Sequence, residues 1–85
     1  MYEIYTSNKR VEKKLNYYIE IRKDILNKLN RLKINPRKDC GAHQLHGDLH
    51  RKWACWLGSK IRMVYVIDDL NKTIFVEDVG THKIY

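Results

Sequence analysis

Four histidines, all in the second half of the chain, are the side chains best suited to chemistry: His43, His46, His50 and His82. Imidazole titrates near neutral pH, so a histidine can act as a general acid or a general base, and it can also ligate a metal ion. Cys40 precedes the first three, and the spacing Cys40-x2-His43-x2-His46-x3-His50 is dense in metal-ligand residue types.

A zinc site would need about four such nitrogen and sulfur ligands in a tetrahedron. Side chains alternate along an extended segment, so His43 and His46 would point to opposite faces of a strand. We therefore expect chemistry without a metal or other cofactor, with structural zinc as the less favoured alternative. A disulfide between Cys40 and Cys55 is also disfavoured, because a small secreted domain usually carries more than two cysteines.

The charge of the chain is unevenly distributed. The formal net charge is +7, and residues 1–38 carry all of it, with eleven Lys or Arg against four Asp or Glu. This excess indicates a polyanionic partner such as RNA, attracted through salt-sensitive contacts to residues such as Lys9, Lys13 and Lys14. A helix face that is simply solvated explains the same pattern.

The composition predicts one folded domain that spans residues 1–85, with 44% hydrophobic and 32% charged residues. No apolar run approaches the ~20 residues of a membrane span, so we expect no membrane association. The segment Met1–Tyr5 lacks the basic and long apolar regions of a signal peptide. Together with the sparse cysteines, these features predict a cytoplasmic protein with reduced thiols.

The first half of the chain predicts a short strand followed by two helices. Ser7 or Asn8 can cap the first helix. We expect a break near Asn16–Tyr18, and then a second helix that runs to about Lys33 and ends at Asn35-Pro36. The apolar positions at helical spacing are Val11 and Leu15 in the first helix, then Ile21, Ile25, Leu29 and Leu32 in the second.

The second half changes to the two-residue period of strands. A short extended segment is expected at His43–Gly47, and the alternating runs Lys52–Leu57 and Lys60–Ile67 flank a two-residue hairpin turn at Gly58-Ser59. A turn at residues 68–71 leads to the last strand, Thr73–Val79.

This order predicts an α+β fold: an N-terminal strand, a two-helix hairpin, then a three- to four-stranded, mainly antiparallel sheet. The helices would cover one sheet face and leave the other open to a partner. Arg62 lies on the opposite face from Ile61 and Met63, and the pattern leaves open which of these faces the helices cover.

Several short motifs follow one another along the second half of the chain. They are Leu-His-Gly-Asp-Leu at Leu45–Leu49, Trp53, Ile-Arg-Met-Val-Tyr-Val-Ile-Asp at Ile61–Asp68, Val-Gly-Thr-His at Val79–His82, and Tyr85. In this order and spacing they resemble the RelE/ParE superfamily, the toxins of bacterial and archaeal toxin–antitoxin modules. The Gly-Thr-His ending and Ala42–Gly47 are most similar to the YafQ branch.

The resemblance implies a ribonuclease that enters the ribosomal A site and cuts mRNA there without a metal. It also implies a cognate antitoxin that wraps the toxin in a hetero-oligomer and blocks it. The matched functional positions are His43 and His82, the active-site Arg62, and the C-terminal aromatic Tyr85, which lies one residue nearer the histidine than in the family.

Metal-free RNA cleavage needs a base for the 2′-hydroxyl, an acid for the departing 5′-oxygen, and positive charge on the phosphate. His43 and His82 can supply the base and the acid. Arg62 can hold two phosphate oxygens with its planar fork, or it can instead brace the C-terminal tail. Tyr85 could orient the phosphate or stack on a base.

A second set of residues could bind the RNA on either side of the cut. Trp56 could stack on a nucleotide, whereas Trp53 is more typical of a core residue. The YafQ branch has a further His at the position of Trp56 and an acid at that of Lys60, so this chain departs from the family at both. The RNA-binding candidates are His46, Arg51, Lys52, Trp56, Lys60 and Lys83.

A non-enzymatic function is the main alternative. A ParE-like toxin with the same fold would inhibit DNA gyrase by binding alone. Such a protein would not need the acid–base set around Arg62, so that set favours the ribonuclease. A degenerate toxin retained as a repressor subunit with its antitoxin is a third interpretation.

Overall fold

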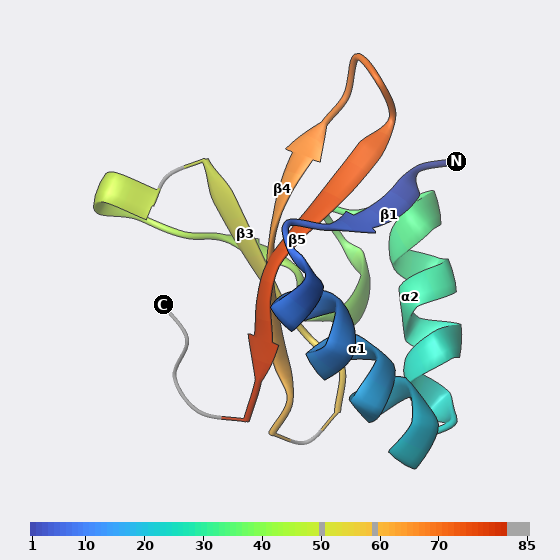
Figure 1. The fold of residues 1–85 in the computed structure, drawn as a ribbon. Helices are drawn as coiled ribbons and strands as arrows, with labels where there is room; N and C mark the ends of the chain where they lie inside the picture. The colour runs from blue at the N-terminus through green and yellow to red at the C-terminus, as the bar shows by residue number, and fades with distance from the viewer. Residues whose placement is uncertain (50, 59, 82–85) are drawn as a thin grey trace.

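A computed structural model describes residues 1–49, 51–58 and 60–81, and Figure 1 shows its helices and strands. Two short 3-10 turns, Asp39–Gly41 and Gly47–Leu49, flank the second strand. The elements are β1 (Glu3–Thr6), α1 (Lys9–Ile21), α2 (Asp24–Ile34), β2 (His43–Gln44), β3 (Lys52–Trp56), β4 (Arg62–Asp68) and β5 (Thr73–Gly80).

The strands of the described residues form one mixed sheet in the order β1-β5-β4-β3-β2. β1 runs parallel to β5, and the other neighbours are antiparallel. The two-helix connection between β1 and the rest of the sheet allows the parallel pair, which a tight hairpin could not join. The predicted α+β fold with a mainly antiparallel sheet is confirmed.

Both helices lie on one side of the sheet (Figure 1), where they bury the main hydrophobic core. The helices contribute the apolar positions that recur at helical spacing, and the strands contribute alternate residues. Ile61 and Met63 point into this core, so Arg62 lies on the uncovered face. The fully buried core side chains are Val11, Ile25, Leu32, Cys55, Leu57, Met63, Tyr65, Ile74, Val76 and Val79.

The expected helix break near Asn16–Tyr18 is wrong. α1 continues to Ile21 and ends at Arg22, whose backbone is extended. Nothing at positions 16–18 opposes helix, and Tyr18 packs against the core from within it. The later end also corrects the assignment of Ile21, which belongs to α1 and is 55% exposed rather than part of the buried stripe of α2.

The hairpin between β3 and β4 is longer than expected. The backbone N–H of Leu57 donates to the carbonyl of Ile61, so three positions, 58–60, connect the paired residues rather than two. Gly58 lies close to the Arg22 side chain: a Cβ added at position 58 would be 3.1 Å from the guanidinium. This contact joins the hairpin to the end of α1.

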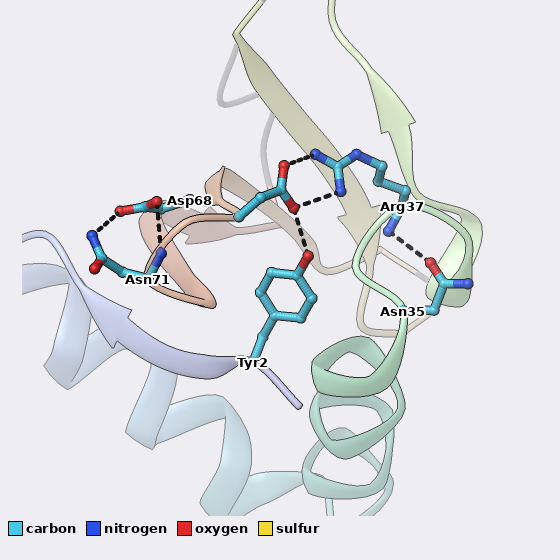
Figure 2. A network of polar contacts seen from close by, with 6 residues as sticks. Tyr2, Asn35, Arg37, Asp68 and Asn71 are labelled. Carbon is cyan, nitrogen blue, oxygen red and sulfur yellow. Dashed lines mark hydrogen bonds and ion pairs between the residues drawn. The ribbon is translucent and has the colours of Figure 1, made fainter.

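The N-terminal segment, the loop after α2 and the β4–β5 turn meet in one polar network. Figure 2 shows Tyr2 and Arg37 converging on a single carboxylate, that of Asp69. Arg37 donates to both carboxylate oxygens, at 3.0 and 2.7 Å, and the Tyr2 hydroxyl donates to one of them at 2.5 Å. None of the described helices has the length and apolar character needed to cross a membrane.

Candidate active site

Arg62 and Trp56 form the central contact on the uncovered sheet face. They are register partners on β4 and β3, so their side chains lie directly opposite each other on one face. The Arg62 guanidinium carbon lies over the Trp56 ring, 4.5 Å from its centroid, which is cation–π geometry. The arginine that was expected to hold phosphate therefore has an aromatic side chain beneath it.

Gly41 brings a backbone turn against the same tryptophan. Its φ of +65° is in the left-handed region, and an added Cβ would lie 3.2 Å from Cδ1 of Trp56. Cys40 before it also has a positive φ, 58°. The chain thus turns sharply beside the indole, at a position where only glycine fits without strain.

His43 joins this group from β2. Its register partner is Ala54, which lies two residues before Trp56 on β3, so His43, Trp56 and Arg62 share one sheet face. His43 is exposed, and its Nδ1 lies 3.2 Å from the carbonyl oxygen of Gly41. If Nδ1 carries the proton, Nε2 is left as a base.

A small apolar cluster lies beside these polar groups on the same face of the sheet. Leu45, Ala54 and Val64 are buried together on the uncovered face, apart from the core under the helices. The partner of Ala54 on β4 is Val64, so the cluster lies directly beside the His43 position. The packing of this cluster helps to fix the relative positions of the strands that carry His43 and Arg62.

The remaining catalytic candidates, His82 and Tyr85, lie outside the described residues, as does Lys83. The described chain does run up to them. Gly80, near the end of β5, is the register partner of Arg62. In the sequence only Thr81 separates Gly80 from His82.

The RNA-binding candidates differ in how available they are. His46, Arg51 and Lys60 are exposed. Lys52 forms an ion pair with Glu77, with Nζ and Oε1 2.5 Å apart, so its charge is already partly neutralised. Trp56 is 37% exposed, and the Arg62 guanidinium lies over its ring.

The cysteines show no catalytic or metal-binding arrangement. Cys40 Sγ contacts the carbonyl oxygen of Lys28 at 3.4 Å, toward α2, and both Cys40 and Cys55 are free thiols. Burial raises the pKa of each thiol, which disfavours the reactive thiolate. No group of three His, Cys, Asp or Glu side chains within the described ranges could hold a metal ion, and His50 lies outside them.

A cavity of about 350 Å³ lies away from this site, between β1 and α1. β1 is the opposite edge of the sheet from β2, so the cavity does not include His43. The residues that line it are Ile4, Tyr5, Thr6, Glu12, Leu15 and Asn16.

Two features of the site were absent from the sequence-based expectations. The contact between Gly41 and Trp56 gave no signal, because a single glycine in a loop has many explanations. The pairing of Trp56 with Arg62 was in principle accessible, since a three-residue hairpin loop after Leu57 places residues 56 and 62 opposite each other. The assumed two-residue turn hid it.

The described residues form an α+β fold with Arg62 on the uncovered face of the sheet. No protein-family model matches the chain, and no curated protein matches its sequence. Solved structures do match. The isolated RelE toxin from E. coli has a TM-score of 0.74 and 22% identity, over 100% of this chain and 88% of that one.

Two other structures are similar over nearly the whole chain. YoeB from Staphylococcus aureus, in a heterotetrameric toxin–antitoxin complex with YefM, has a TM-score of 0.73 and 18% identity, over 98% of this chain and 99% of that one. A variant of YafQ from E. coli gives 0.64 and 19%, over 96% and 94%. This chain therefore has the fold of the RelE/ParE toxins, and the fold that its motifs predicted is confirmed.

Proposed function

We propose that this chain, acting as one domain over residues 1–85, is the toxin of a type II toxin–antitoxin system and a ribosome-dependent mRNA endoribonuclease. One observation carries the proposal. On the uncovered face of a RelE-type sheet, Arg62 lies over Trp56, and His43 shares that face. Gly80 is the register partner of Arg62, and His82 follows it two residues later in the sequence. A toxin that acts by binding alone would not need an acid–base set around Arg62.

The proposed reaction is attack of a ribose 2′-hydroxyl on the adjacent phosphorus. The new P–O2′ bond forms as the P–O5′ bond breaks, which leaves a 2′,3′-cyclic phosphate and a free 5′-hydroxyl. One of His43 and His82 removes the 2′-hydroxyl proton, and the other protonates the 5′-oxygen. Arg62 stabilises the charge that builds on the non-bridging oxygens, with Tyr85 as a further contact.

The same proposal includes the partners. The complex of YoeB with YefM supports a cognate antitoxin that binds this chain in a hetero-oligomer. The proposed location, the cytoplasm, is predicted from the sparse cysteines of the sequence. The ribosome and its mRNA are the proposed target. His46, Arg51, Lys60 and Lys83 are the proposed phosphate contacts, with a smaller contribution from Lys52 because Glu77 already pairs with it.

The test is mRNA integrity in a translating extract, mapped by primer extension. Wild-type protein should produce cuts that require ribosomes, and His43→Gln or His82→Gln should each reduce the cleavage rate by roughly 10²–10⁴ while antitoxin binding is retained. Intact mRNA with the wild-type protein would reject the nuclease. A gyrase supercoiling assay on the same sample would then test the ParE-like alternative.

A further inference from the structure

Two groups of this chain contact the Trp56 ring, although the side chain is 37% exposed. The guanidinium of Arg62 lies 4.5 Å from its ring centroid, and its Cδ1 edge faces Gly41. The sequence allows Trp56 to stack on a nucleotide, but a base would have to compete with Arg62 for the ring face that the guanidinium covers. In this structure the indole is in cation–π contact with Arg62.

An arginine side chain is long and loses rotamer freedom when it is held in one place. A guanidinium over an aromatic face is held through its π surface, while its N–H groups in the plane stay available to donate to a phosphate. The indole can therefore restrict Arg62 without using the donors that a phosphate needs.

The glycine at position 41 leaves room for the Trp56 indole. A side chain at position 41 would contact Cδ1 of Trp56 at 3.2 Å and would also be strained at a φ of +65°. The same residue's carbonyl oxygen lies 3.2 Å from Nδ1 of His43. Gly41 thus lies next to both Trp56, which contacts the arginine, and His43, the candidate base.

We propose that Trp56 is a positioning residue that holds the Arg62 guanidinium at the phosphate site, and that Gly41 is the glycine its position requires. This inference rests on the proposed ribonuclease function. It assigns Trp56 a role through Arg62 rather than through direct contact with the RNA.

The experiment measures ribosome-dependent cleavage of one mRNA by the wild-type protein and the variants Trp56→Phe and Trp56→Leu. Phe keeps an aromatic face, so it should stay within about threefold of wild type, whereas Leu should lower kcat roughly 5- to 30-fold with KM little changed. Phe75→Leu is the matched control, because Phe75 is 39% exposed against 37% for Trp56 and lies on β5. It should leave kcat unchanged.

A double-mutant cycle separates positioning from structural support. In an Arg62→Gln background no cation remains for the indole to hold, so adding Trp56→Leu should lower the residual rate less than twofold. The NMR signal of the Arg62 Nε–H group should be shielded by the aromatic ring at position 56 in the wild-type protein and in Trp56→Phe, and should move downfield in Trp56→Leu. Gly41→Ala should shift the same signal.

The outcomes are distinguishable. Equal kcat values for wild type and Trp56→Leu, or a loss of the same size with and without Arg62, would overturn the positioning role. A loss confined to KM would instead assign Trp56 to RNA contact. An inactive wild-type protein would reject the ribonuclease proposal itself, and this is seen before any variant is compared.

Discussion

Tyr65 shows how much one side chain can contribute to holding the layers together. It is the largest of the fully buried side chains among the described residues, and its hydroxyl donates to the carbonyl oxygen of Pro36 at 2.6 Å. Burial raises the pKa of this hydroxyl well above its usual range, so it remains a donor throughout the working pH range. The bond ties the loop after α2 to the centre of β4.

Tyr65→Phe should therefore destabilise the protein by about 1–3 kcal/mol, because the buried Pro36 carbonyl oxygen would lose its donor. Urea unfolding followed by circular dichroism measures the change. Tyr17→Phe, at a ring that is 57% exposed, is the control and should stay within about 0.5 kcal/mol of wild type. Equal effects of the two substitutions would contradict the role of the buried hydrogen bond.

At the scale of elements, α1 begins where a single side chain caps it. The backbone N–H of Val11 donates to Oδ1 of Asn8 at 2.9 Å, which satisfies one of the free donors of the first turn. The sequence allowed either Ser7 or Asn8 as the cap, and the structure selects Asn8. Ser7 instead donates its backbone N–H to Val76 of β5.

Asn8→Ala should cost about 0.5–2 kcal/mol of stability, since alanine cannot accept that hydrogen bond. Ser7→Ala is the matched control one residue away, and it keeps the backbone bond to Val76. Thermal unfolding of both variants measures the difference. A Ser7→Ala variant that is less stable than Asn8→Ala would show that the cap is assigned to the wrong residue.

At the scale of the whole molecule, the network in Figure 2 connects segments that are far apart in the chain. Tyr2, Arg37 and Asp69 come from the N-terminal segment, the loop after α2 and the β4–β5 turn. Hydrogen bonds from Arg37, and then from Tyr2, hold the pKa of the Asp69 carboxyl well below its usual range. The ionised form of the Asp69 carboxyl is therefore the one that stabilises the contacts among these three segments.

The pH dependence follows from that sign. Because the pKa of Asp69 is lower in the folded than in the unfolded chain, its contribution is fully present above the unfolded value of about 3.9 and is lost as the pH falls below it. Asp69→Asn should have a lower Tm than wild type at pH 7, and the gap should narrow between about pH 4 and pH 2. A gap that is independent of pH would contradict the assignment.

The basic surface also belongs to this scale. Lys14 pairs with Asp78 of β5, with Nζ and Oδ1 2.8 Å apart, so it supports the packing of α1 rather than a free cationic face. Lys9, Arg10 and Lys13 remain exposed. These three, without Lys14, are the candidates for RNA docking.

Replacing Lys9, Arg10 and Lys13 by Gln should reduce the salt dependence of ribosome binding, lowering the slope of log K against log salt by about two. Lys14→Gln should change stability and leave that slope nearly unaltered. Cosedimentation with ribosomes at several salt concentrations measures both. An unchanged slope for the triple variant would mean that this helix face is only solvated.

The element order and the fold class could be predicted from the sequence, because apolar spacing and Pro36 are local signals that each segment carries alone. The sequence also placed Arg62 opposite Ile61 and Met63, since side chains alternate along a strand. The packing of the helices, which the sequence does not show, places Ile61 and Met63 on the covered face. In the folded chain α1 ends at Arg22, where Gly58 and Asp24 lie close to the guanidinium.

The tertiary structure also decided the composition of the site. The contacts of Trp56 with Arg62 and Gly41, and of Lys52 with Glu77, depend on strand register and on a turn in the left-handed region. Register is fixed by how whole strands pack, and a shift of one residue would move every side chain to the other face. For that reason the sequence could name His43 and Arg62 as candidates but could not assign Trp56 its neighbours.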